Sequence, residues 1–500
     1  MSDANIALNR FGLGARPDEA APADPRRWLS AQFERYEAKP AALGAVPTRR
    51  KIAGELADFY EMQRGQQGQR ARRQPAAAPA MAATPDPTMA GTKGAAAAAA
   101  DIADAADPVA QARRYARQQG RDAYAVAVGA RANIALTTPA PFVERLVHFW
   151  ANHFAISIDK LTVVGLGGLL EFEAIRPHVL GKFGDMLLAV ERHPAMLLYL
   201  DQAQSVGPGS ALGSRAGRYN PNRKVGLNEN LAREILELHT LGVRTGYAQA
   251  DVTEFARAMT GWSVAGISRG PGARIAGTLG EPGDFVFAER IHEPGERTII
   301  GKRYGQEGAG QAEAVLRDLA VHPATAKHIA TKLARHFAGD EPPPALIVRL
   351  EQAFLTSGGD LPSVYRALIA APEPWVAAPV KFKTPWEWSV ATWRALGLKQ
   401  VQPLPTVGLL NQLGQPVWRP GSPAGWDDVG PSWAGPDAIM RRVEAAERFA
   451  TRAPQVDARA LAPRLFPAAL SPATSQQLAR AESPGQALAL LLVAPEAMRR

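Results

Sequence analysis

Apolar residues recur at helical spacing in nearly every segment of this 500-residue chain, and this periodicity is the feature that most limits its fold. Segments such as PRRWLSAQFERY, PFVERLVHFWANHFAI and FGDMLLAVERHPAMLLYLD place apolar side chains three and four positions apart, as in helices with one buried face. Only residues 263–304 contain strand-like material, where GDFVFAERIHEPGERTIIGKRYG alternates apolar and polar residues between turn signals. We therefore expect a mainly α-helical fold, a large multi-helix body with a small β-hairpin element near 284–300.

One segment departs from this pattern. Residues 64–108 are rich in Ala, Pro, Gly and Gln and hold almost no large apolar side chain. Such a composition buries too little surface to offset the entropy of ordering, so we expect a disordered Ala/Pro-rich insertion. It separates an N-terminal helical part (1–63) from a central helical core (109–262). A loop and β-hairpin (263–304) and a C-terminal helical part (305–500), packed on the same body, follow.

The composition excludes several kinds of site. The absence of cysteine rules out disulfides, thiol nucleophiles, iron–sulfur clusters and Cys-bound zinc, so any metal would rest on His, Asp and Glu. The phosphate-loop and dinucleotide fingerprints are absent, so nothing in the sequence indicates a nucleotide site. Nothing in the sequence indicates a haem either. A net charge of +9 would suit an anionic partner, but nucleic-acid binding rests on charge alone and ranks last.

The N-terminus, MSDANIALNRFGLGARPDE, lacks the basic and apolar regions of a secretory signal. The longest apolar runs, near 161–170 and 487–494, are shorter than the roughly 18 residues that a spanning helix needs. We therefore expect a cytoplasmic protein with no transmembrane segment, with export alongside a signal-bearing partner as the alternative.

The densest group of chemistry-bearing residues lies in GLNENLAREILELHTLGVRTGYAQADVTEFARAMTGW, residues 226–262. On an α-helix, the leucine and isoleucine side chains of this stretch form one apolar stripe. Glu229, Arg233 and Glu237 stand four positions apart on the opposite side, where they can pair with one another. For these three residues a solvated helix face is a nearly complete explanation.

Glu234 and His239 fit that explanation less well, because the same arithmetic places them at opposite edges of the stripe, each half buried. Their spacing matches neither the Glu-x-x-His of ferritin-like bundles nor the His-Glu-x-x-His of zinc proteases. A metal site would need other segments, and VHFWANHFAI, which contains His153, is the best supplier. A histidine among aromatic residues is nonetheless more often a hydrogen-bonded core residue than a ligand.

Our leading hypothesis is an enzyme, or an accessory subunit of one, with a His/Glu polar pocket that performs metal-assisted hydrolysis or acid–base chemistry. The predicted catalytic residues are Glu234, Glu237 and His239; the predicted ligands of a divalent metal are His153 and His239; and the predicted substrate-binding residues are Trp150, Asn152, Asn228, Glu229, Arg233 and His292. The alternative is a non-catalytic helical binding or assembly protein with a basic surface.

Several stretches, in order along the chain, resemble a known family. They include IALNRFGLGARP, RLVHFWANHF, NENLAREILELHTLGV, FVFAERIHEPGERTIIG, HPATAKHIATKLARHFAGDEPP, FKTPWEW and GQPVWRPGSPAGW. The chain is similar, apart from the insertion, to the large bacterial family catalogued as "domain of unknown function 1800". The resemblance implies a partner encoded nearby that looks like a sulfatase or phosphatase relative. It assigns no catalytic residues, and many members are exported whereas this chain begins at the first motif.

Overall fold

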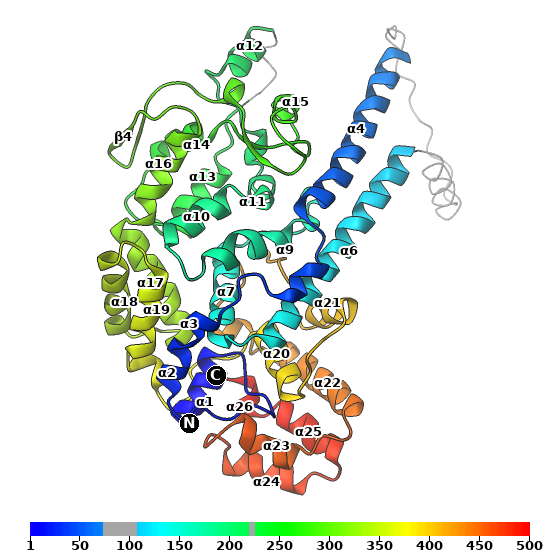
Figure 1. Cartoon of the computed structure of the whole chain (residues 1–500), viewed down its shortest axis with the longest axis vertical. Helices are drawn as coiled ribbons and strands as arrows, with labels where there is room; N and C mark the ends of the chain where they lie inside the picture. Colours follow the sequence, from blue (N-terminus) through cyan, green and yellow to red (C-terminus); the bar gives the residue numbers. More distant parts are fainter. Residues whose placement is uncertain (74–107, 220–225) are drawn as a thin grey trace, which may run out of the picture.

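The computed structural model describes residues 1–73, 108–219 and 226–500, and it confirms the mainly α-helical fold. Figure 1 shows an elongated arrangement, with the strands and α12–α16 toward one end and α22–α26 toward the other. In the described residues, the strands form two small antiparallel sheets of two strands each. No helix in this described part is long and apolar enough to cross a membrane.

The N-terminal elements are α1 (Asp3–Ile6), η1 (Ala7–Phe11), α2 (Pro25–Ser30), α3 (Gln32–Arg35), η2 (Ala41–Ala45) and α4 (Arg49–Arg73). The central elements are α6 (Pro108–Thr137), α7 (Pro141–His153), α8 (Leu161–Val164), α9 (Gly167–Leu169), η3 (Leu170–Ile175), η4 (Arg176–His178), α10 (Phe183–Glu191), α11 (Pro194–Tyr199), η5 (Gln202–Gln204), α12 (Ala211–Tyr219), α13 (Asn230–Glu234), η6 (Ile235–His239) and α14 (Gln249–Met259).

The strand-bearing region contains β1 (Trp262–Val264), α15 (Ala273–Ala276), β2 (Phe285–Phe287), η7 (Glu289–Ile291), β3 (Arg297–Ile299) and β4 (Lys302–Tyr304). The C-terminal elements are α16 (Ala309–Ala320), α17 (Pro323–Ala338), α18 (Pro344–Thr356), α19 (Leu361–Ala370), η8 (Glu373–Trp375), α20 (Pro385–Ala395), α21 (Pro403–Gln412), η9 (Gly430–Ser432), α22 (Pro436–Arg452), α23 (Ala458–Leu465), α24 (Pro472–Arg480), α25 (Pro484–Leu492) and α26 (Pro495–Met498).

The strand material contains a hairpin, as expected, but it is formed by β3 and β4 over 297–304, and β2 belongs to a second pair. β2 pairs with β1, so that Trp262 faces Phe287, and β3 pairs with β4, so that Arg297 faces Tyr304. The chain between β2 and β3 forms the short 3-10 turn η7 instead of a tight hairpin turn. The alternating pattern therefore found the strands, but it did not identify β1 as the partner of β2.

Helix α4 continues to Arg73, past the predicted boundary of the insertion at 64. α4 and α6 pack side by side and form the arm at the upper right of Figure 1. Residues 74–107 lie outside the described residues, so the predicted disorder there is not described.

One large hydrophobic core draws residues from the N-terminal, central and C-terminal segments. Phe11, for example, packs against Phe142 and Phe337 with ring centroids 5.6 and 5.4 Å apart. A second core lies among α22–α26 and includes Trp388 of α20. Figure 1 places both ends of the chain close together, beside α26 and α1. Helix α20 contributes to both cores, and its N-terminus carries part of the site described next.

Candidate active site

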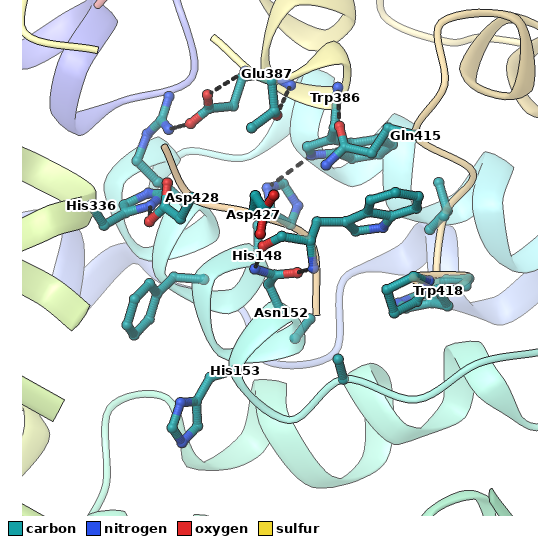
Figure 2. Close-up of a pocket in the computed structure, with 18 of the residues that line it drawn as sticks. His148, Asn152, His153, His336, Trp386, Glu387, Gln415, Trp418, Asp427 and Asp428 are labelled. Carbon is teal, nitrogen blue, oxygen red and sulfur yellow. Dashed lines mark hydrogen bonds and ion pairs between the residues drawn. The ribbon is translucent and has the colours of Figure 1, made fainter. Parts of the chain in front are cut away.

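A pocket lies where α7, α17, the N-terminus of α20 and the loop after α21 meet (Figure 2). Its cavity volume is about 110 Å³. We call it the tryptophan pocket, because Trp386, Trp418 and Trp426 line it. Its other lining residues are Leu13, Arg131, Arg145, His148, Phe149, Ala151, Asn152, His153, Ala155, Ile156, Lys332, His336, Thr384, Glu387, Gln415, Val417, Pro420, Asp427 and Asp428.

Glu387 holds together the charged wall of the pocket. It belongs to a capping box at the start of α20: its carboxylate accepts the backbone N–H of Thr384 at 2.9 Å, and its own N–H donates to the Thr384 hydroxyl. The same carboxylate pairs with the buried guanidinium groups of Arg145 and Arg500, the latter at 2.9 Å. Burial alone would raise the pKa of Glu387, but the two arginines hold it well below its usual range.

His336, near the end of α17, forms a partly buried pair with Asp428. The His336 Nδ1 atom lies 2.9 Å from Asp428 Oδ2, and the Lys381 ammonium lies 3.0 Å from the other carboxylate oxygen. Burial lowers the pKa of His336 to about 4 even though Asp428 opposes the shift. Burial would raise the pKa of Asp428, but His336 and Lys381 keep it well below the ordinary value. At neutral pH the imidazole is therefore neutral and the carboxylate is charged.

The tautomer of His336 follows from this geometry. Because Asp428 can only accept, the proton of the neutral ring sits on Nδ1 and the lone pair is on Nε2. The Nε2 atom is buried and has no hydrogen-bond partner among the described residues. A neutral imidazole held by a carboxylate, with a free acceptor nitrogen, is the arrangement that general bases use.

Lys332 lies one turn before His336 on α17 and also lines the pocket. It is half-buried, and burial lowers the pKa of its ammonium to about 8 while Asp428 opposes the shift. Lys332 makes no hydrogen bond or ion pair with any other residue in the described part of the chain. The pocket therefore contains one amino group that no protein carboxylate neutralises by contact.

The aromatic side of the pocket is built around Arg131. Its guanidinium stacks 4.2 Å from the Trp386 ring and 5.6 Å from the Trp418 ring, and its Nε donates to Glu171 at 2.8 Å. Glu171 also accepts the indole N–H of Trp418 at 3.0 Å. Trp418 has a positive φ of 50°, a backbone conformation that is costly for a large side chain and that clusters at functional sites.

Asn152 was predicted to bind substrate, and its side chain bonds to the backbone of Trp426 in the loop after α21. Its Nδ2 donates to the Trp426 carbonyl at 2.8 Å and its Oδ1 accepts the Trp426 N–H at 2.7 Å. Figure 2 shows this clasp beneath Asp427. Asn152 thus lines the pocket and positions Trp426, with both polar atoms already engaged. His148 is engaged in a similar way, since its Nδ1 accepts the Trp386 indole N–H at 3.1 Å.

The predicted metal ligands lie near each other; each makes one protein contact, and each keeps one buried ring nitrogen, His153 Nδ1 and His239 Nε2, without a hydrogen-bond partner in the described residues. His153 Nε2 donates to the His239 carbonyl at 3.1 Å, and the two ring centroids are 6.2 Å apart. The Nδ1 of His239 lies 2.7 Å from Glu191. Among the residues that the structure describes, no three His, Asp or Glu side chains are arranged to hold a metal ion. In Figure 2 His153 points away from the centre of the pocket.

His239 is fully buried instead of half-buried as predicted. The cause is local: α13 ends at Glu234, and the next five residues form the π-helical turn η6. A π turn bonds i to i+5, so positions counted at 100° per residue no longer describe the faces. Glu234 is half-buried as expected, and burial raises its pKa. It does not line the tryptophan pocket.

The remaining predicted residues also lie outside the pocket lining. Arg233 pairs with Glu229 at 3.2 Å and with Glu237 at 3.6 Å, as their spacing predicts. Asn228 accepts the Asn230 N–H at 2.9 Å before the start of α13, whose N-cap position is Glu229 and not Asn228 as expected. These contacts are those of a solvated helix face.

Trp150 and His292 have structural contacts as well. Trp150 is fully buried in α7 and donates its indole N–H to the Tyr365 hydroxyl at 2.7 Å. The Nδ1 of His292 donates to the Thr260 carbonyl at 2.7 Å, in the strand-bearing region. The structure therefore brings together only Asn152 and His153 of the predicted site residues at the pocket.

The comparisons with known proteins agree with the resemblance noted in the sequence. No curated protein and no solved structure matches the chain. A family model matches residues 6–499. Because this match covers nearly the whole chain, the protein belongs to the family described as "Protein of unknown function (DUF1800)".

Proposed function

We propose that the protein is an enzyme that binds a small polar substrate in the tryptophan pocket and takes a proton from it. His336 accepts the proton at Nε2, and Asp428 stabilises the imidazolium as it forms. The observation that carries the proposal is the His336 Nε2 atom, buried and without a partner in the described residues while Nδ1 is held 2.9 Å from Asp428. Buried polar atoms are normally hydrogen-bonded, so an orphaned acceptor in a pocket indicates a missing partner.

The surroundings of His336 support this role. Burial keeps its pKa near 4, so the ring is unprotonated at neutral pH, and the Asp428 carboxylate supplies the charge that stabilises the imidazolium during proton transfer. Lys381 fixes Asp428, because its ammonium contacts the carboxylate at 3.0 Å and donates to the backbone carbonyls of Asp428 at 2.6 Å and Arg335 at 2.9 Å. The base and its carboxylate are therefore held in one geometry before any substrate binds, which is what efficient proton transfer needs.

This proposal keeps the acid–base chemistry expected from the sequence but moves it to other residues. Glu237 is paired on a solvated helix face, and His239 is buried against Glu191. His336 and Asp428 replace them as the groups that handle the proton. The alternative of a binding protein without catalysis is the outcome in which the pocket holds a ligand and converts nothing.

The test compares purified wild-type protein with His336→Gln after incubation with a small-molecule extract of the source cells, read by mass spectrometry. We expect compounds that the wild type consumes, with a rate about 100-fold or more lower for His336→Gln, because removing a general base costs about 10²–10⁴-fold. His292→Gln, which changes a histidine remote from the pocket lining, is the matched control and should retain activity. Consumption of nothing by the wild type, or equal rates for His336→Gln, contradicts the proposal.

A further inference from the structure

We infer that the substrate of the tryptophan pocket is a small anionic sugar, a single hydroxylated ring with an acidic group, whose acid binds Lys332. The inference rests on the proposed function, because it names the substrate class of the same site. Three properties of the pocket carry it: an ammonium without a counterion in contact, unengaged groups suited to hydroxyls, and aromatic walls around a space for one ring.

The acid-binding property comes from Lys332. Of the cations that line the pocket, Arg145 is committed to Glu387 and Arg131 to Glu171 through Nε. Lys332 has no such partner in the described residues. A half-buried ammonium with no counterion in contact is costly, and a carboxylate, sulfate or phosphate on the ligand would supply the missing charge.

The hydroxyl-binding property comes from two polar residues on the loop that follows α21. The Oε1 atom of Gln415 accepts the backbone N–H of Trp386 at 2.7 Å. The Nε2 atom of Gln415 has no partner in the described part of the chain. Asp427 is exposed, and its Oδ2 accepts the Ser432 hydroxyl at 2.8 Å. Its other oxygen has no partner among the described side chains. An acceptor and a donor of this kind suit the hydroxyl groups of a sugar.

Asp427 also decides against a ligand that is only an anion. A carboxylate at the pocket would repel a bare anion, but it accepts the O–H groups of a hydroxylated ring. The anionic group is therefore expected at Lys332 and the hydroxyl groups at Asp427, and the ring joins them.

The walls and the size of the pocket favour one ring. Trp386, Trp418 and Trp426 line it, and Figure 2 shows Trp386 and Trp418 beside the cavity. Indole faces give apolar contact and leave polar edges for hydrogen bonds. The cavity of about 110 Å³ is well below the roughly 300–1,000 Å³ of sites for drug-sized ligands, so it favours a ligand of one ring.

The experiment measures binding by ligand-observed NMR and by tryptophan fluorescence, with D-glucuronate, D-glucose 6-phosphate, D-glucose and benzoate as the probes. We expect at least one of the two anionic sugars to bind about tenfold or more tightly than glucose, which lacks the charge, and benzoate, which lacks the hydroxyls. The two anionic sugars distinguish a carboxylate from a phosphate source.

Variants of α17 locate the interaction. Lys332→Met should weaken binding of the anionic sugar by about tenfold or more, while Lys332→Arg, which keeps the charge, should retain most of it. Lys327→Met, which removes an exposed lysine from the same helix, is the matched control and should leave binding unchanged. Glucose binding as tightly as both anionic sugars, no binding of either anionic sugar, or full binding by Lys332→Met would overturn the inference.

The two proposals fail separately. His336→Gln is expected to keep the preference for the anionic sugar over glucose, because the variant removes the base and leaves Lys332 in place. If an anionic sugar binds but His336→Gln keeps full turnover, His336 is not the base, and the proposed ligand class still holds. If neither anionic sugar binds but a neutral compound is turned over in a His336-dependent way, the proposed ligand class is wrong and the proposed base still holds.

Discussion

Replacing Glu387 by glutamine removes one negative charge from the wall of the pocket at nearly constant volume. Arg145 is 3% exposed and Arg500 0%, so neither guanidinium can turn to water when the carboxylate is lost. Arg145 keeps its bond to the Gly12 carbonyl at 2.7 Å, and Arg500 keeps its bond to the His336 carbonyl at 2.6 Å. The two cations would nevertheless face each other with no anion between them.

Breaking a buried ion pair by removing one partner costs about 3–5 kcal/mol, because an uncompensated charge stays buried. We therefore expect Glu387→Gln to lower the free energy of unfolding by about that amount. Glu296→Gln is the control, since Glu296 pairs with Arg303 where the side chains are 58% and 76% exposed. An exposed pair contributes about 0–1 kcal/mol, so the control should be nearly neutral.

The pH dependence separates a charge effect from a packing defect. Because the pKa of Glu387 is held below its ordinary 4.5, the carboxylate stabilises the fold above pH 4.5, and this contribution is lost as the pH falls through the folded value. The stability gap between the wild type and Glu387→Gln should therefore narrow in acid. Thermal unfolding from pH 7.5 to 3.5 provides the measurement. A loss no larger than that of Glu296→Gln, or a gap that is constant with pH, would refute this reasoning.

Three further predictions concern single side chains. Asn152→Ala removes two hydrogen bonds to the Trp426 backbone, so it should cost about 1–3 kcal/mol and weaken ligand binding through a looser loop, as hydrogen exchange at 426 would report. Lys383→Met should stabilise the protein by about 2–4 kcal/mol at pH 7, because burial lowers the Lys383 pKa to about 7. Since the unfolded lysine stays protonated up to about pH 10.4, that gain should vanish near pH 10, and a destabilised variant would contradict the assignment. His328 and His336 both have pKa values near 4, so wild-type stability should fall between pH 6.5 and 4 by up to about 3 kcal/mol for each. His328→Gln should show a shallower decline in thermal unfolding, and an unchanged slope would count against buried neutral imidazoles.

The fold was largely predictable because its signals are local. The helix α19 illustrates this: aspartate is a favoured N-cap residue, and Asp360 accepts the Ser363 N–H at the start of Leu361–Ala370. The predictions were wrong where a pairing depends on a residue far away in the sequence, or where the helix geometry is not that of an α-helix. β2 looked like half of a hairpin, but its partner β1 lies before α15. The π-helical turn η6 buried His239 more deeply than an α-helical wheel allows.

The site was not predictable in this way, because three of its pairs join residues far apart in the sequence. His336 and Asp428 are 92 positions apart, Asn152 and Trp426 are 274, and Arg145 and Glu387 are 242. Local charge density pointed instead to Asn228–His239, but charges that crowd one helix face mostly pair with each other in water.

A better local signal was present in Thr-Pro-Trp-Glu at 384–387. A capping box predicts that its glutamate bonds to the backbone N–H of its own first turn. A glutamate flanked by Trp386 and Trp388 is also placed among buried aromatic residues, where a carboxylate is stable only with cationic partners. The sequence around Glu387 therefore indicates cationic partners from elsewhere in the chain, and in the folded structure these partners are Arg145 and Arg500. Buried charge that local structure cannot neutralise is a stronger sign of a pocket than charge that it can.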